Sequence, residues 1–469
     1  MIVSDLGDPT FFEKFSLKKA ANRHSVCTFR QRADEEKISV YQNAVGKKIH
    51  VSLNDGRPIF FGEVVEVVVE QNYGGIYAEI KAVSDSLKLD EKNETRIFQN
   101  PDKTFGNVLN DLRLNISNCK VNLEEFSAQK CPEIIFQHEE TNFNFINRLA
   151  AWKCLRVWVK DTFQDTVELK VATCANDSPN NIEDEDIVRL KIGRRQKIHV
   201  AELVTEKYFE LGRILNLGNN TRQYLITALE VYQKNGVDFV RYSLEEFKDL
   251  EPAALCNPAP LKLRATVLDV KDDKNFGRLK VQFEIEDKDT NKAWLPYRTP
   301  YGGMVFMPEK GDTVEVFYTS GECYVNSVLR TKILDEEFHK DVENEKYLGN
   351  NRNQRIFFRE KSFEIKSFDT SIFMDDKKIV LSVGKNKVTL DEQGITMQTE
   401  GAFRSEVAKD FSNKVGGNMT NDVSKKISVK SGSEIVNDAS SNFSVKSGGK
   451  FTAKASGAAQ IGGSSVELG

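Results

Sequence analysis

The chain has 469 residues, of which 29% are charged and 39% hydrophobic, a composition typical of globular proteins. Its 66 basic and 70 acidic residues give a formal net charge of −4. This balance argues against a dedicated nucleic-acid binder, which needs a basic surplus to displace phosphate counterions. No stretch of the sequence approaches the roughly 20 apolar residues that span a bilayer. The start, MIVSDLGDPT, lacks the basic and apolar regions of a signal peptide, so we expect no Sec-type export.

The seven cysteines form no CxxC pair, which argues against a zinc knuckle or a disulfide framework and predicts free, buried thiols. The length predicts roughly three domains. The composition is uneven, because the last proline, tryptophan and cysteine are Pro308, Trp294 and Cys323. The final third of the chain is therefore expected to be built differently from the rest.

The first 250 residues predict strands mixed with two helices. Residues 56–70 and 74–90 read as paired strands, and residues 226–234 and 237–247 as two more. Helical spacing first follows Pro101, and the second helix has Thr141 as its expected N-cap. The apolar positions behind the two helices are Phe105, Val108, Leu109 and Leu112, and then Phe145, Ile146, Leu149 and Ala150.

Residues 258–333 predict a compact all-β module. Leu279, Val281 and Phe283 alternate with polar residues, which is the period of a half-buried strand. Turn sequences at 272–277, 301–303 and 308–312 separate short strands, and this pattern suggests an OB-like barrel. Basic and acidic residues are nearly balanced here, so we expect no nucleic-acid binding.

Three motifs in this module carry a family resemblance: GRLKVQF at 277–283, Trp294, and PEKGDTV at 308–314. They resemble the OB module of VgrG proteins and phage baseplate spike proteins. The QxxE strand end at 137–140, followed by Phe145 and Arg148-Leu149, is similar to the hub of the same proteins. The resemblance implies a phage-tail-hub-like domain with two β-barrels and short helices over 1–250, an OB-fold domain over 258–333, and a linker over 334–356.

The tail is an internal repeat of sixteen residues. Frames that begin at Lys414, Lys430 and Lys446 keep glycine at the third place and serine at the eleventh. Their apolar residues fall on even places, the period of two that puts side chains on one face of a strand. Polarity alone would also permit a disordered tail, but the constant parity speaks against it. We therefore expect a β-helix or β-prism over 357–469.

Each frame offers too few apolar groups to bury its own face, so three interwound chains would be needed to form a core. The predicted fold is mainly β and ends in an intertwined trimeric β-helix (β-prism). The residues expected in the trimer core are Phe403, Phe411, Met419, Ile427, Val429, Ile435, Phe443, Val445, Phe451 and Ile461.

The last residues leave the repeat and predict a blunt apolar end that invites a cap. Val466, Leu468 and Gly469 are the expected tip-protein-binding residues, and the resemblance implies a PAAR-type protein there. Some phage spikes end in a metal-binding HxH tip, but the last histidine of this chain is His339.

We expect no catalytic residues, no metal and no cofactor, and hence no enzyme. The five histidines lack metal-ligand spacing. His138 beside two glutamates is interpreted as structural rather than as an acid–base group. Asp422, Glu434 and Asp438 follow the repeat and are interpreted as solvated rather than as a glycosidase pair.

The resemblance implies a homotrimeric puncturing spike and tube-docking hub of a contractile injection system, delivering a tip protein or effectors through a target envelope. Its expected partners are its own copies, a hexameric tube protein, a PAAR-type tip protein, baseplate proteins and possible effectors. We expect assembly in the bacterial cytoplasm, followed by expulsion into the target cell or the medium. The alternative is a trimeric phage tail fibre or adhesin that binds a surface glycan.

Overall fold

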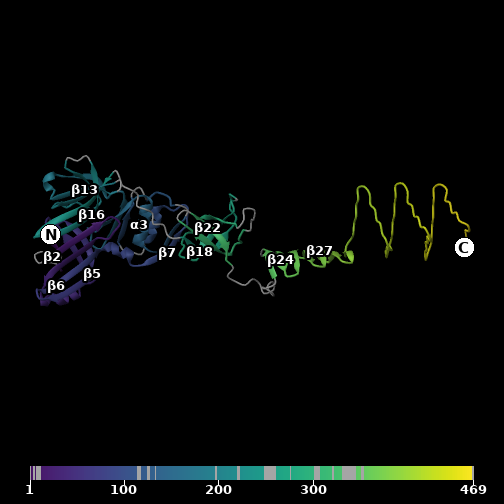
Figure 1. Cartoon of the computed structure of the whole chain (residues 1–469), viewed down its shortest axis with the longest axis horizontal. Helices are drawn as coiled ribbons and strands as arrows, with labels where there is room; N and C mark the ends of the chain where they lie inside the picture. The colour runs from purple at the N-terminus through teal and green to yellow at the C-terminus, as the bar shows by residue number, and fades with distance from the viewer. Residues whose placement is uncertain are drawn as a thin grey trace. The chain divides into compact units, whose positions relative to one another are not determined.

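The computed structural model describes residues 2–3, 6, 12–113, 118–123, 127–131, 134–195, 198–218, 222–247, 260–274, 276–299, 307–319, 322–329, 345–349 and 353–466. The chain divides into two compact units, residues 1–336 and 337–469, which are described separately (Figure 1). The described residues confirm the expected class, since they form many strands and a few short helices.

The largest element of the first unit is a 12-stranded sheet among its described residues. Its main path joins β1 (Ile2–Val3), β4 (Lys48–Ser52), β5 (Pro58–Asn72), β6 (Gly75–Ser84), β3 (Val26–Ala33), β2 (Phe12–Ala20), β16 (Gln223–Lys234), β17 (Val237–Glu246), β14 (Ile198–Thr205) and β13 (Arg189–Arg195). Off this path, β15 (Arg213–Leu217) pairs with β16 and with β12 (Asn176–Ile182).

The strands expected to form two separate hub barrels lie in this one continuous sheet. The antiparallel pairing of β2 with β16, from Ala20↔Ala228 to Ser16↔Tyr232, joins the early strands to the late ones. A single buried cluster, which includes Phe15, Phe60 and Tyr242, packs against both groups of strands. A pairing between strands about 200 residues apart leaves no local signal in the sequence.

The helices pack on a second buried cluster. The helices α2 (Phe105–Arg113) and α3 (Asn142–Trp152) bury the apolar positions predicted for them. The hydroxyl of Thr141 accepts a hydrogen bond from Asn144 N at 3.2 Å, which confirms the expected N-cap. The remaining elements here are α1 (Ile38–Gln42), the 3₁₀ turns Glu35–Lys37, Asp85–Asp90 and Asp184–Asp186, the sheet β10 (Arg156–Lys160), β11 (Val167–Ala172) and β8 (Cys119–Asn122), and the pair β7 (Asn93–Phe98) and β9 (Ile135–Thr141).

The OB-like module is a five-stranded sheet with its own core. The strand order is β20 (Trp294–Pro296), β19 (Arg278–Phe283), β18 (Leu261–Asp269), β21 (Thr313–Tyr318) and β22 (Cys323–Val328). Strand β19 alternates half-buried and buried residues along its whole length, as predicted. The end of β20 reaches β22 through the bridge Tyr297↔Val325 and the hydrogen bond from Arg298 N to Val325 O, at 2.9 Å. This contact joins the two edges of the sheet into a barrel.

The second unit begins with an antiparallel meander of seven strands. Each strand pairs with the next one along the chain, so the sheet grows by one hairpin at a time (Figure 1). The strands are β23 (Glu345–Gly349), β24 (Gln354–Arg359), β25 (Ser362–Ser367), β26 (Thr370–Asp375), β27 (Lys378–Val383), β28 (Asn386–Asp391) and β29 (Gly394–Gln398).

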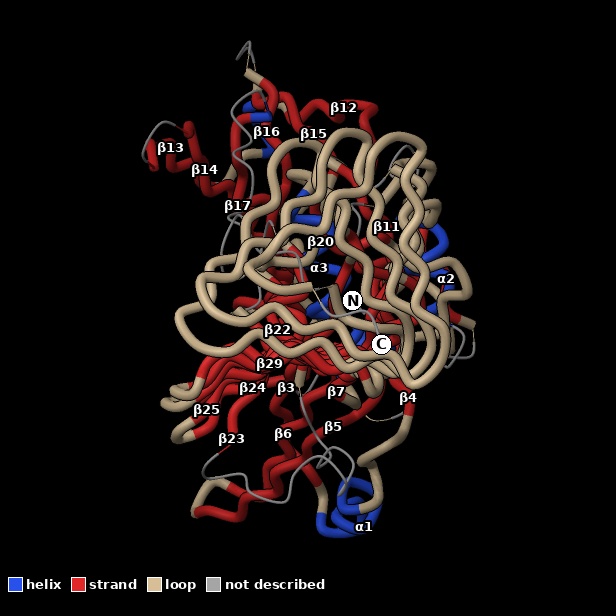
Figure 2. The backbone as a smooth tube through the Cα atoms, turned by 90° about the vertical axis from the view of Figure 1, so that its right-hand side faces the viewer, coloured by secondary structure: helices blue, strands red, loops and turns tan. Residues whose placement is uncertain are grey.

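One eight-residue period runs through the second unit. From β24 onward the strands start at 354, 362, 370, 378, 386 and 394. Beyond β29 the strands stop, but bends continue at 400–401, 408–409, 416–417, 424–425, 432–433, 440–441, 448–449 and 456–457. Figure 1 shows this tail as a regular wave, and Figure 2, turned by 90°, shows it as wide tan coils. The sixteen-residue frame found in the sequence therefore spans two structural repeats.

Candidate assembly surfaces

One face of the meander is an exposed apolar surface. Cross-strand neighbours form two continuous apolar rows that run through all strands from β24 to β29. The first row is Ile356, Ile365, Ile372, Leu381, Val388 and Met397, and the second is Phe358, Phe363, Met374, Ile379, Leu390 and Ile395. We call these two rows the apolar ladders. Most of their side chains remain exposed in the single chain.

The other face of the meander is mostly polar. Arg359 and Glu364 form an ion pair at 3.0 Å, and the hydroxyls of Ser371 and Ser382 lie 2.8 Å apart. A sheet with one polar and one apolar face normally packs the apolar face on a core. Among the described residues of this unit, nothing covers the apolar ladders, so the sheet presents a surface ready to be buried.

The tail continues the apolar surface in single columns. We call residues 402–409, 410–417 and so on to 458–465 the octads; each of the first seven ends in a bend. The second place of every octad is apolar: Phe403, Phe411, Met419, Ile427, Ile435, Phe443, Phe451 and Ala459. The fourth place adds Val429, Val445 and Ile461. The ten residues predicted for a trimer core all lie in these two columns.

These ten side chains are exposed in the single chain, from 54% for Ile435 to 79% for Ile461. Such a long series of exposed apolar residues is uncommon on a monomeric protein and marks an interaction surface. Of the predicted tip residues, Val466 is exposed, whereas Leu468 and Gly469 lie outside the described residues.

The backbone of the tail lacks the ladder that the meander has. No strand pairing is assigned within residues 399–466, although the chain bends at the same interval as the hairpins before it. A self-stacked coil would pair its successive turns through backbone hydrogen bonds. The exposed apolar columns and the unpaired backbone of the tail are therefore both available to other chains.

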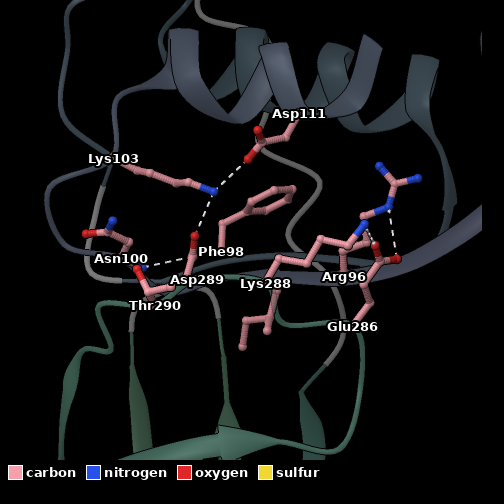
Figure 3. Close-up of a pocket in the computed structure, with 10 residues that line it drawn as sticks. Arg96, Phe98, Asn100, Lys103, Asp111, Glu286, Lys288, Asp289 and Thr290 are labelled. Atoms are coloured by element: carbon pink, nitrogen blue, oxygen red, sulfur yellow. Dashed lines mark hydrogen bonds and ion pairs between the residues drawn. The ribbon is translucent and has the colours of Figure 1, made fainter. Parts of the chain in front are cut away.

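A polar seam fixes the OB module to the preceding domain within the first unit. The carboxylate of Asp289, which is 4% exposed, accepts hydrogen bonds from Gln99 N at 2.7 Å and Asn100 N at 3.1 Å. Its other oxygen pairs with Lys103 Nζ at 2.7 Å, and the same ammonium reaches Asp111 at 2.6 Å (Figure 3). Burial alone would lower the pKa of Lys103, but its hydrogen bonds to Asp111 and Asp289 raise that pKa above its ordinary value.

A second part of the seam lies on either side of Asp289. Ile97 N donates to Glu286 O at 3.0 Å, and Gln99 Nε2 donates to Asp287 Oδ2 at 2.5 Å. Asp287 also pairs with Lys292 at 2.7 Å, with both side chains buried. A cavity of about 380 Å³ opens beside these contacts, lined by both domains. The seam holds the loop after β19 against the turn after β7 as one piece.

The groups that the sequence offered as possible acid–base or metal-binding residues form no common site among the described residues. His138 stacks on Phe136 with ring centroids 5.4 Å apart, as expected for a structural residue. Asp422, Glu434 and Asp438 are exposed on the tail. Within the described part of the chain, no group of three or more His, Cys, Asp or Glu side chains is placed to hold a metal ion.

The described cysteines are free, and burial raises the pKa of the Cys131 thiol to about 12. The expectation of buried thiols holds fully for Cys27, but Cys154 is exposed, and Cys256 lies outside the described residues. No helix in the described portion is both long and apolar enough to cross a membrane.

Sequence reasoning found the tail columns but missed two features. It did not foresee that cross-strand pairing joins the apolar residues of β24 to β29 into continuous rows. In β25, Phe363 and Ile365 alternate with polar residues and carried that signal, whereas in β26 Phe373 stands between Ile372 and Met374 and obscures it. The Asp289 seam was missed because its partners lie about 190 residues apart.

A family model matches residues 263–329: the type VI secretion system/phage-baseplate injector OB domain. The match covers the module in which the sequence motifs lie. Among the curated proteins, none matches the chain.

Solved structures share the fold over most of the chain. The E. coli c3393 protein, a type VI secretion system component with structural similarity to the T4 bacteriophage tail proteins gp27 and gp5, is 12% identical with a TM-score of 0.52, over 70% of this chain and 99% of that one. A chain of the half-lidded Francisella PdpA–VgrG complex is 10% identical with a TM-score of 0.52, over 83% of each chain. The lidded form of that complex gives 9% identity and a TM-score of 0.54, over 83% of this chain and 76% of that one. These findings confirm the resemblance inferred from the motifs.

Proposed function

Because the chain belongs with the type VI secretion and phage-baseplate spike proteins, whose OB domain and fold it carries, we propose that it is the homotrimeric hub and puncturing spike of a contractile injection system. In this proposal residues 1–250 are the hub, residues 258–333 are an OB collar, residues 334–356 are a linker, and residues 357–469 are the spike.

The observation that carries the proposal is the uncovered apolar surface of the second unit. The apolar ladders and the tail columns follow the same eight-residue interval of strands and bends, and most of their side chains are exposed in the single chain. Three copies that turn these surfaces toward a common axis would bury them without any further domain. Burial of apolar area contributes about 25 cal/mol per Å². Burying the apolar ladders and the tail columns of three copies would therefore give an assembly that does not dissociate at ordinary concentrations.

The role that follows is mechanical. In an interwound trimer the strand edges of the tail would pair between chains, so bending the spike would require many hydrogen bonds to break together. The Asp289 seam would pass the load from the OB collar to the hub without a flexible joint. A puncturing device needs this combination of a stiff shaft and a rigid base.

The partners belong to the same proposal. The hub would dock on a hexameric tube protein and other baseplate proteins, and a PAAR-type protein would cover Val466, Leu468 and Gly469 at the tip. Effectors would travel with the spike. The spike would assemble inside the producing bacterium and leave it with the tube, and it would act without catalysis or a cofactor.

Sedimentation analysis of the full-length chain tests the proposal. We expect a trimer that persists on dilution to nanomolar concentration. A stable monomer would overturn the proposal, because the exposed surface would then have another purpose. Capture of a recombinant tube protein by the trimer would test the hub separately.

A further inference from the structure

A column of alternating charge runs along the tail. The fifth place of the first six octads holds Glu406, Lys414, Asp422, Lys430, Asp438 and Lys446, whose sign changes at each step; the last two octads, with Lys454 and Gly462 there, do not continue the alternation. We call these six residues the charge column. All six side chains are exposed, and none makes an ion pair within the described tail of the single chain.

The charge column lies opposite the apolar columns. In an extended chain, alternate residues point to opposite faces. The apolar residues occupy the second and fourth places of each octad, and the charge column occupies the fifth. When the apolar face turns inward, the charges therefore point to solvent on the outside of the assembled spike.

The charge column shares the sixteen-residue period of glycine and serine at the bends, although the chain bends every eight residues. Two octads are needed to restore the same sign at the fifth place. A requirement of each octad alone would give an eight-residue sequence repeat. The alternation therefore records a relation between each octad and the one stacked on it.

The register of the three chains decides which octads are stacked. Suppose that each of three chains covers one face of the spike for one octad and then bends to the next face, one level higher. On any single face, an octad of the first chain then lies below the next-numbered octad of a second chain. Charges at the fifth place would meet opposite charges there, and directly opposed unlike charges stabilise neighbouring strands.

The other arrangement stacks equal-numbered octads of different chains. Glu406 would then lie on Glu406, and Lys414 on Lys414, at every level. Like charges that face each other directly across neighbouring strands are destabilising. The sequence therefore favours the first arrangement over the second.

We propose that the charge column sets the register of the three chains, so that each octad stacks on the next-numbered octad of a second copy. This inference rests on the proposed trimeric spike, and the partner that it names is another copy of this chain. The recognition is electrostatic, between single opposite charges on adjacent strands.

Two full-length variants of equal net charge test the column. The reversed variant carries Glu406→Lys, Lys414→Glu, Asp422→Lys, Lys430→Glu, Asp438→Lys and Lys446→Glu, and so keeps the alternation. The block variant carries Glu406→Lys, Asp422→Lys, Lys430→Glu and Lys446→Glu, and so groups like charges together. We expect the reversed trimer to melt like the wild type, and the block trimer to melt several degrees lower at low salt, with the gap closing at high salt.

Co-expression separates the two stackings. Wild-type and reversed chains with different affinity tags would form like-charge contacts in mixed trimers if next-numbered octads stack. Fewer mixed trimers than in a control with two differently tagged wild-type chains would support the proposal. More mixed trimers would support equal-numbered stacking, and equal amounts would show that the column sets no register; either result overturns the inference. A wild-type chain that is not trimeric would instead overturn the proposed function.

Discussion

Asp272 fixes the turn that leads from β18 into β19. Its carboxylate accepts from Arg278 Nε at 2.7 Å and from the second guanidinium nitrogen at 2.8 Å. The backbone nitrogens of Lys274 and Phe276 also donate to it, at 3.1 and 3.2 Å. Arg278 first, and then these backbone groups, hold the pKa of Asp272 well below its ordinary value. One side chain thus closes the turn that the sequence predicted at 272–277.

Asp272→Asn should therefore destabilise the protein in a pH-dependent way. A carboxylate whose pKa is depressed by folding contributes stability that is complete above its ordinary pKa of 3.8 and is lost as the pH falls toward the lower folded value. We expect the variant to melt below the wild type at pH 7 and the gap to narrow below about pH 4. Thermal melts from pH 7 to pH 3 measure this, with the exposed neighbour in Asp273→Asn as the control. A gap that stays constant with pH would contradict the argument.

Asp289 has a similar role at the seam between the two domains of the first unit. Its removal leaves two backbone N–H groups and the half-buried ammonium of Lys103 with fewer acceptors. We expect Asp289→Ala to lower the free energy of unfolding by about 2–4 kcal/mol, since broken buried polar networks cost this much. Denaturant melts measure it.

Lys288→Ala is the matched control for Asp289→Ala, because Lys288 belongs to the same loop and its side chain is 85% exposed. It should change the free energy of unfolding by less than about 0.5 kcal/mol. Equal losses in the two variants would show that the loop, rather than the Asp289 contacts, sets the stability of the seam.

At the scale of elements, the sequence predicts what local periodicity determines. Alternation in β19 and the N-cap Thr141 each depend on a few neighbouring residues, and the structure agrees with both predictions. The pairing of β2 with β16 and the Asp289 seam depend on segments about 200 residues apart. A single sequence considered alone carries no signal for contacts at that distance. The eight-residue period lies between these cases, because glycine and serine alternate at the bends and give the sequence a sixteen-residue frame.

Two adjacent residues of β29 test whether the apolar ladders are buried in the assembly. Met397 belongs to the first ladder and Thr396 to the opposite face, and both are exposed in the single chain. We expect Met397→Asp to weaken the trimer strongly, because three charges would enter an apolar core, whereas Thr396→Asp should have little effect. Sedimentation across a concentration series measures dissociation. Equal behaviour of the two variants would indicate that this face stays in solvent.

At the scale of the whole molecule, folding and assembly depend on different parts of the chain. The three buried clusters described in the first unit all consist of residues before 326. The second unit has few fully buried side chains, and its large apolar residues are mostly exposed in the single chain. The first unit therefore has its own core, whereas in the proposed trimer the second unit would gain one from the other copies.

A stop codon after Gln398 separates the two requirements. The shortened chain keeps all three clusters and the whole meander but loses the tail columns. We expect the first unit to melt as in the full-length protein, while the trimer dissociates at higher protein concentration because less apolar area is buried between chains. A stop after Gly457, which removes little more than the last octad, should give a much smaller loss. A shortened chain whose trimer is as resistant to dilution as the full-length one would place the assembly interface in the meander or the first unit instead of the tail.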